Sequence, residues 1–333
     1  MTTKALALFS GGLDSILACR VMALQGIEVL AVKFVSPFFD RHLLGSDYCQ
    51  KIDEKYEINV QLVDISDDYI QLLRSPAHGF GKHFNPCLDC KIFMMSRARE
   101  MMQAAGASFL ISGEVVGQRP MSQRRDALRL VERDSGCDGI LLRPLCAKKL
   151  EPTNAELAGL VDREELYDIN GRSRSGQIAL AKEFGVTDYP TPAGGCMLTD
   201  PVVGQRIKLF YAEHENISAS DIQHITVGRQ FQLPGGGWLA LGHKESENIL
   251  MEGNVQPQDV QLRLEDRPGP LAVLRFETSK DDIEIAASLV ARYGKKDSNG
   301  NPCPGRVRCI GDGDDYLIDA SPIAEDRIAP MRR

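Results

Sequence analysis

The sequence contains no run of apolar residues long enough to span a bilayer, so it indicates no membrane-embedded segment. A strand-like apolar pattern begins within the first residues, which leaves no room for a secretory signal. The Gly-Lys-Ser/Thr of a Walker loop is also missing at the required spacing, and this excludes the common P-loop class of nucleotide-binding proteins. We therefore expect a cytoplasmic protein without a membrane partner.

An excess of positive charge is missing as well. The chain carries 39 Lys and Arg against 46 Asp and Glu, a net charge of −7 at pH 7. Any contact with a nucleic acid must then come from a local patch. Cysteine, in contrast, is present in nine copies, an odd number. This count favours a reducing compartment and thiol or metal chemistry.

The length of the chain and a change in its pattern of predicted secondary structure indicate two domains. At 333 residues the sequence can bury two cores. The predicted pattern changes near Asp200-Pro201, where alternating strands and helices are followed by short strands around glycine-rich turns. We place one domain at residues 1–200 and a smaller α+β domain at residues 201–333.

The N-terminal segment is organised around Ser10-Gly11-Gly12-Leu13-Asp14-Ser15. An apolar strand precedes this turn and a helix from Ile16 to Gln25 follows it, stopped by Gly26. Free N–H groups and the helix dipole then point at one place, which suits a phosphate. Ser10 and Ser15 can add hydroxyl donors. Because Asp14 would repel a phosphate, its presence suggests Mg²⁺ nearby.

Strands and helices alternate after this turn and predict a parallel α/β sheet. Strands are expected at 28–34, 59–64 and 108–112, with a helix at 44–56 between the first two. Ligands of such sheets lie at the carboxyl ends of the strands, where Lys33 and Phe34 also fall. Phe34 can stack on a purine or pack in the core.

Three cysteines stand in settings typical of ligands. Cys87-Leu88-Asp89-Cys90 follows Asn-Pro and opens a helix that runs to about residue 105, where the dipole lowers a thiol pKa. The pair can be half of a metal or cluster site, a redox pair, or incidental. After a polar loop at 168–176 and a helix at 177–184, Cys196 follows a turn rich in proline and glycine that leaves its thiol accessible.

The glycine turn resembles the pyrophosphate loop of the N-type ATP pyrophosphatases. Further motifs make the segment from about residue 4 to 200 similar to the ThiI-type tRNA 4-thiouridine synthases. These motifs are Phe34-Val35-Ser36-Pro37, Ser112-Gly113-Glu114-x-x-Gly117-Gln118 with Ser122-Gln123, and Arg143-Pro144-Leu145. The resemblance implies a parallel-sheet, adenine nucleotide alpha hydrolase-like (HUP-type) fold. It also implies ATP contacts at Ser10, Gly11, Gly12, Asp14, Ser15, Lys33, Phe34, Lys91, Gly113, Gln118 and Gln123.

The same resemblance implies a role for the three cysteines. In some related thiolation enzymes such a set holds a four-iron–four-sulfur cluster with one iron left open for sulfide. In others, cysteines carry a persulfide and close a disulfide in each turnover. Cys87, Cys90 and Cys196 are therefore expected to converge, and counting the ligands favours a [4Fe-4S] cluster.

The C-terminal segment resembles the NFACT-R module, a presumed RNA-binding domain. The residues that carry this likeness are Gly228-Arg229-x-Phe231 and Leu241-Gly242-x-x-Glu245-x-Glu247-Asn248. His243 stands where the module has an arginine. ThiI-type enzymes carry RNA-binding modules ahead of the loop, whereas here the loop starts at residue 10. We expect the C-terminal module to bind the RNA instead.

Together these patterns predict an ATP-dependent RNA sulfurtransferase that acts on a uridine, with tRNA as the expected RNA. ATP adenylates the carbonyl oxygen of the base, and sulfur from sulfide or from a persulfide-carrying protein replaces it. One alternative is an ATP-dependent amidotransferase or ligase of a small molecule. Another is a non-catalytic RNA-binding adapter that retains a nucleotide pocket. Formation of AMP and pyrophosphate stimulated by RNA separates the three.

Overall fold

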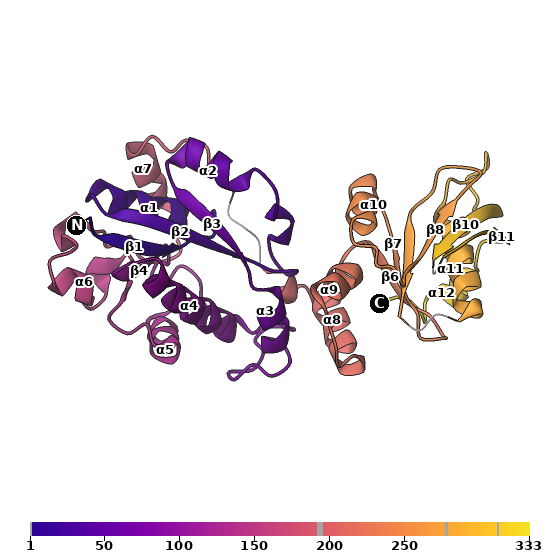
Figure 1. The fold of residues 1–333 in the computed structure, drawn as a ribbon, viewed down its shortest axis with the longest axis horizontal. Coiled ribbons are helices and arrows are strands. Elements are labelled where there is room, and N and C mark those ends of the chain that lie inside the picture. The colour runs from indigo at the N-terminus through magenta and orange to yellow at the C-terminus, as the bar shows by residue number, and fades with distance from the viewer. Residues whose placement is uncertain (1, 192–195, 277–278, 312) are drawn as a thin grey trace. The chain divides into compact units, whose positions relative to one another are not determined.

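The computed structural model describes residues 2–191, 196–276, 279–311 and 313–333 (Figure 1). Packing divides the chain into two compact units, Met1–Pro201 and Val202–Arg333. Within the described ranges, no helix combines the length and apolar character needed to cross a membrane. The assignment of thiolation to residues 1–200 and of RNA binding to residues 201–333 stays a prediction.

The N-terminal unit is built on a parallel sheet in the order β3-β2-β1-β4-β5. Its strands are β1 (Lys4–Leu8), β2 (Glu28–Val35), β3 (Asn59–Asp64), β4 (Phe109–Ser112) and β5 (Leu141–Leu142). The order turns back at β1, because the chain first adds strands on one side and then crosses over to add β4 and β5 on the other. Such a switch point is where open α/β sheets bind ligands.

Helices cover both faces of this sheet. They are α1 (Leu13–Leu24), α2 (Tyr48–Tyr56), α3 (Ser66–Leu72), α4 (Cys87–Ala104), α5 (Arg125–Ser135), α6 (Asn154–Leu157) and α7 (Ser175–Glu183). Figure 1 shows α1, α2 and α7 on one side and α4 and α5 on the other, and α1 packs on α7 as α4 packs on α5. Short 3-10 turns lie at Arg41–Leu43, Ala147–Lys149, Arg163–Glu165 and Met197–Thr199.

Local residues explain where these elements begin and end. The central strand β1 carries fully buried apolar residues, and Gly26, with φ of +73°, ends the turn after α1 as predicted. The helix expected from residue 44 begins only at Tyr48. Gly45 has φ of +73°, a left-handed conformation that a helix does not continue through. The predicted α/β class, with a smaller α+β domain after it, is confirmed.

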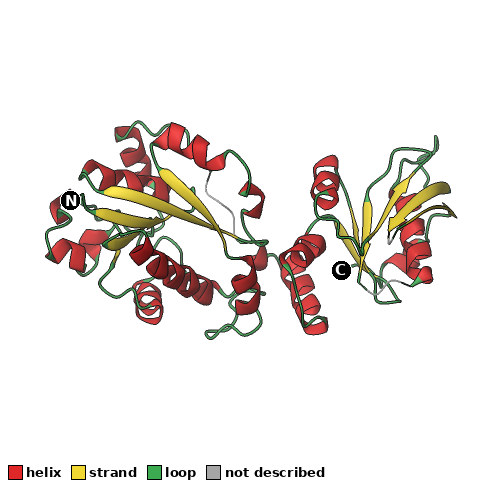
Figure 2. Ribbon diagram, viewed as in Figure 1, coloured by secondary structure: helices red, strands yellow, loops and turns green. Residues whose placement is uncertain are grey.

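The C-terminal unit is an antiparallel sheet with helices (Figure 2). The strand order is β11-β10-β8-β9-β7-β6. The strands are β6 (Arg229–Gln232), β7 (Trp238–Leu241), β8 (Val260–Leu264), β9 (Ala272–Arg275), β10 (Gly305–Gly311) and β11 (Asp314–Ala320). The helices are α8 (Pro201–Glu213), α9 (Ala219–Thr226), α10 (Glu245–Glu252), α11 (Lys280–Tyr293) and α12 (Glu325–Ile328). Buried residues of α11 form one core with β8, β9 and β10.

Two expectations for this unit are wrong. The sequence at 224–234 predicts a short strand. Residues 224–226 instead close α9, because Ser218 and Asp221 form a capping box that starts a helix there. The glycine and proline residues around Cys303 and Cys309 predict a loop that contains both cysteines. Cys309 lies instead in β10, fully buried, where small apolar side chains are needed against α11.

His224 makes the stability of the C-terminal unit depend on pH. The imidazole is buried, and its Nε2 lies 3.0 Å from the carbonyl oxygen of Trp238. Burial and the charge of Arg275 lower the pKa of His224 to about 4. An unfolded histidine titrates near 6.5, so stability is complete above that pH and falls as the pH drops toward 4.

We expect the free energy of unfolding to fall by about 2 kcal/mol between pH 7 and pH 5. Trp238 is the only tryptophan in the sequence, so its fluorescence during urea unfolding follows this unit. His224→Gln retains an amide donor for the Trp238 carbonyl but does not titrate. An equally steep pH dependence in that variant would contradict the assignment.

Candidate functional site

The turn between β1 and α1 has the geometry of an anion site. Gly11 has φ of +82°, and Gly12 caps α1 without a side-chain hydrogen bond among the described residues. The first N–H groups of α1 therefore stay available to an anion. The Ser10 hydroxyl lies 3.3 Å from that of Ser15, which itself donates to the Gly12 carbonyl at 2.8 Å.

Gly113 fits directly against the start of α1. A Cβ atom at this position would lie 2.5 Å from the backbone carbonyl of Asp14, closer than real side chains allow. We call the turn at residues 10–15 the phosphate turn, after its predicted ligand. The segment after β4 can approach it only because residue 113 is glycine. The close approach brings Gln118 to Asp14, and its amide donates to Oδ2 at 2.9 Å.

Two lysines expected to contact ATP are held by carboxylates. Lys33 is buried on β2, and its Nζ donates to the Ser10 carbonyl at 2.8 Å and to Asp40 at 2.6 Å. Lys91, on the first turn of α4, pairs with Glu114. Phe34 is buried as well, so its side chain packs in the unit. Gln123 is buried, and its side-chain carbonyl has no hydrogen-bond partner within the described chain.

Glu114 forms a buried ion network. Its second oxygen accepts from the Arg143 guanidinium at 3.0 Å, and Arg143 also pairs with Glu132. Burial opposes the charge of Glu114, but Lys91 and Arg143 hold the pKa of this carboxyl at about 2. Breaking such a pair is costly, because one charge is left uncompensated. The network therefore fixes the first turn of α4 beside the residue that follows Gly113.

The three predicted cysteines share one neighbour, Tyr69 of α3. Cys87 and Cys90 occupy the first turn of α4, and the Tyr69 hydroxyl donates to the Cys90 thiol. The pKa of Tyr69 is raised by burial and by the charges of Cys90, Cys196 and Cys87. The three thiols also influence one another electrostatically, whereas their convergence on one point stays a prediction.

The expected lowering of a thiol pKa by the α4 dipole is wrong for Cys90. Burial raises the pKa of Cys90 to about 12, and the thiols of Cys196 and Cys87 add to the rise. Desolvation also raises the pKa of Cys196. In the part of the chain that the structure describes, no group of three Cys, His, Asp or Glu is arranged to hold a metal ion. The proline and glycine turn predicted before Cys196 falls on residues 192–195, outside the described residues.

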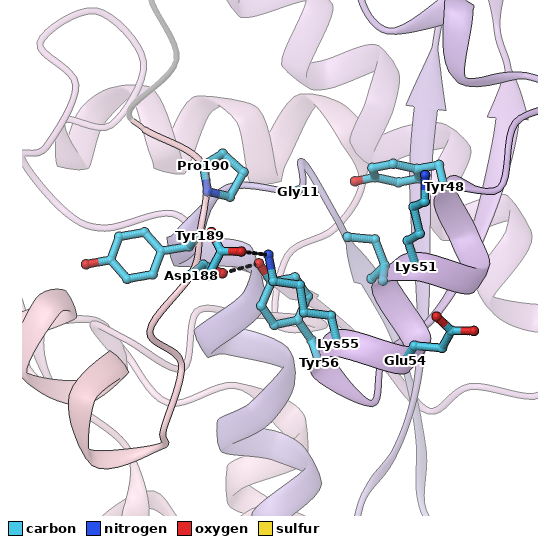
Figure 3. Close-up of a pocket in the computed structure, with 10 residues that line it drawn as sticks. Gly11, Tyr48, Lys51, Glu54, Lys55, Tyr56, Asp188, Tyr189 and Pro190 are labelled. Carbon is cyan, nitrogen blue, oxygen red and sulfur yellow. Dashed lines mark hydrogen bonds and ion pairs between the residues drawn. The ribbon is translucent and has the colours of Figure 1, made fainter.

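A cavity of about 590 Å³ adjoins the phosphate turn at Gly11. Figure 3 shows it between α2 and the segment that leads toward Cys196. Lys55 pairs with Asp188 at 2.6 Å, and the Tyr56 hydroxyl donates to the Asp188 carbonyl at 2.5 Å. These bonds anchor the segment on α2 and leave open space beside the phosphate turn.

The motifs did not identify Tyr69, Arg143 or Arg174 as parts of this site. Tyr69 lies on a short helix without a motif, and only its contacts in space connect it with the cysteines. Arg143 belongs to the motif Arg143-Pro144-Leu145, which resembles a segment of the ThiI-type enzymes but indicates no role for the arginine. Arg174 lies in the polar loop at 168–176, and its Nη2 is 3.8 Å from Asp14 Oδ1. The polar character of that loop was the one signal the sequence offered.

Comparison with known proteins confirms both predicted resemblances. Residues 1–158 match the family model of the thiamine biosynthesis protein ThiI, and residues 228–329 match the RNA-binding domain of NFACT proteins. A probable tRNA sulfurtransferase of Thermococcus kodakarensis is 25% identical over 166 residues, which are 50% of this chain and 39% of that protein. The chain thus spans about two-fifths of the length of this relative.

Two solved structures are similar to the chain at lower identity. A 4-thiouridine synthetase–RNA complex with bound ATP is 21% identical, with 55% of this chain and 41% of the other covered and a TM-score of 0.38. The U34-tRNA thiolase NcsA from Methanococcus maripaludis, with its [4Fe-4S] cluster, is 17% identical. In that case 67% and 70% of the two chains are covered, with a TM-score of 0.33.

Proposed function

We propose that this protein is an ATP-dependent RNA sulfurtransferase that replaces a carbonyl oxygen of a uridine, in tRNA, by sulfur. The observation that carries the proposal is the contact between two sets of residues. Lys91, next to Cys90, pairs with Glu114, and Gly113, next to Glu114, packs on Asp14. A phosphate-binding turn and a group of thiols are therefore joined by neighbouring residues at one edge of the sheet.

In the proposed reaction the turn at residues 10–15 binds the triphosphate of ATP. The carbonyl oxygen of the base attacks the α-phosphorus, the bond to pyrophosphate breaks, and an adenylated base forms. N–H groups of the first turn of α1 and the serine hydroxyls stabilise the charge on the leaving pyrophosphate. Sulfide then attacks the carbon, and AMP leaves with the oxygen. If a persulfide attacks instead, a resolving thiol breaks its S–S bond, which leaves the sulfur on the base and a disulfide on the protein.

Of the two groups that the resemblance implies, Mg²⁺ fits the residues present. Asp14 Oδ1 is buried without a hydrogen bond from any described residue, so this oxygen would hold Mg²⁺, which offsets pyrophosphate charge when bound. Cys87, Cys90 and Cys196 are the thiolates proposed to hold a [4Fe-4S] cluster, which would supply sulfide when bound. The described residues do not arrange three such ligands around one point, so this part of the proposal rests on the resemblance and on the electrostatic influence of the three thiols on one another. A sulfur donor, either sulfide or a persulfide-carrying protein, completes the set of partners.

The C-terminal unit is proposed to hold the RNA. The match to the NFACT RNA-binding domain covers residues 228–329 and supports this role. The name of the Thermococcus relative supports tRNA as the RNA.

The proposal predicts formation of AMP and pyrophosphate that depends on RNA. The full chain is incubated with ATP, Mg²⁺, sulfide and unmodified tRNA under anaerobic conditions, and the products are measured together with thiolated nucleosides by mass spectrometry. We expect tRNA to raise AMP formation at least about tenfold and a thiouridine to appear, because adenylation requires its acceptor. DNA of the same length is the control polyanion.

The rivals give different results in the same assay. A small-molecule ligase forms AMP without a response to RNA. An adapter binds ATP and RNA but forms neither AMP nor thiolated base. Either pattern would overturn the sulfurtransferase proposal.

A further inference from the structure

The polar loop at residues 168–176 packs against the segment that follows β4. The Gly171 N–H donates to the Val116 carbonyl at 2.8 Å. This contact places Arg174, at the start of α7, beside the phosphate turn, with Nη2 3.8 Å from Asp14 Oδ1. The loop therefore brings a cation to the turn from a distant part of the sequence.

Polar atoms around Asp14 are buried with their hydrogen-bonding capacity unused. Within the described ranges, Asp14 Oδ1, Arg174 Nε and Gln177 Oε1 have no hydrogen-bond partner. Gln177 is 0% exposed, and its amide lies 3.4 Å from Gln118 Oε1, while Gln118 donates to Asp14. Buried polar groups of native proteins are almost always paired, so these atoms are typical of a site that ligands complete. Arg174 Nε is a donor and suits an anion, whereas the two oxygens are acceptors and suit a cation or a donor.

The neighbouring cations are already engaged with carboxylates. Lys33 pairs with Asp40, and Lys91 pairs with Glu114. Arg174 differs, because one side of its guanidinium faces Asp14 and its Nε is free in the described structure. A guanidinium holds its donors in a rigid fork and can bind two anions at once.

We infer that Arg174 binds a phosphate oxygen of ATP through Nε while its Nη2 neutralises Asp14. The inference rests on the proposed function, since it takes ATP as the ligand of the turn. Together with the Mg²⁺ that Asp14 would hold, the nearby guanidinium lowers the repulsion between this carboxylate and the phosphates. Arg174 is then a phosphate-binding residue that the family motifs did not include.

The test compares ATP with adenosine, which lacks the phosphates. Dissociation constants of the full chain are measured by calorimetry for Arg174→Ala, Arg174→Lys and Arg172→Ala. Arg172 is exposed in the same loop and provides the matched control. We expect Arg174→Ala to weaken ATP binding at least about tenfold and to leave adenosine binding within about twofold, because a charged hydrogen bond to phosphate is lost. Arg172→Ala should change neither constant.

Arg174→Lys retains the charge beside Asp14 and loses the fork, so we expect it to fold and to bind ATP with intermediate affinity. Equal losses for ATP and adenosine in the Arg174 variants, or unchanged ATP affinity, would overturn the inference alone. If the unsubstituted chain binds no ATP, the inference and the proposed function both fail.

Discussion

Asp14→Ala is expected to abolish pyrophosphate release while the protein stays folded. The carboxylate lies in the first turn of α1, accepts from Gln118 and faces Arg174. Its removal takes away the proposed metal ligand and leaves Arg174 without its counter-charge. Loss of an electrostatic group at such a centre lowers rates by about 100- to 1,000-fold. Pyrophosphate is measured with an enzyme-coupled assay in the presence of tRNA.

Asp126→Ala is the matched control for this variant. Asp126 also lies in the first turn of a helix, α5, but it is exposed and pairs with Arg124. The Asp126→Ala variant should release pyrophosphate at the rate of the unsubstituted chain. Unchanged release by Asp14→Ala, with the same thermal unfolding profile, would mean that the turn does not bind ATP in the proposed way.

The second large effect concerns the thiols. Cys87→Ser, Cys90→Ser and Cys196→Ser are each expected to remove the visible absorbance of an iron–sulfur cluster together with thiolation. A cluster with one open iron needs three thiolates, so no two of them suffice. Protein purified without oxygen is analysed for iron, sulfide and thiolated nucleosides.

Cys49→Ser is the control, because Cys49 is half-buried on α2 and lies outside the proposed thiol group. It should retain iron and activity. A persulfide route needs one nucleophile and one resolving thiol, so one of the three cysteines would be dispensable. Near-normal anaerobic thiolation by Cys87→Ser or Cys90→Ser would rule out the cluster and favour the persulfide route.

The parallel sheet was predictable because its strands are short apolar runs separated by helical stretches that glycine turns bound. Gly113 was correctly placed after β4 by its motif, and its close approach to Asp14 gives the physical reason for glycine there. The start of α2 was not predictable from apolar spacing, because the left-handed Gly45 interrupts the pattern. In the C-terminal unit a capping box overrode the strand propensity of Ile225 and Thr226.

The candidate site was only partly predictable. Motifs indicate residues that touch a ligand, whereas Tyr69 and Arg143 act through partners that are distant in sequence. The pKa of Cys90 shows the same limit. Its position at a helix start predicts a lower value, but the raised pKa follows from burial, which becomes visible only in three dimensions.

The ion pair of Lys91 with Glu114 has a consequence for how much ATP the proposed reaction consumes. An adenylated base that sulfur does not reach is hydrolysed by water, and its ATP is wasted. Lys91 is adjacent to Cys90, and Glu114 is adjacent to Gly113. This single pair therefore aligns the turn at residues 10–15, proposed to bind ATP, with the cysteines proposed to supply sulfur. Buried pairs add little net stability, but they fix position well. In the proposed reaction, the number of ATP molecules consumed per thiolated base would then depend on the Lys91–Glu114 pair.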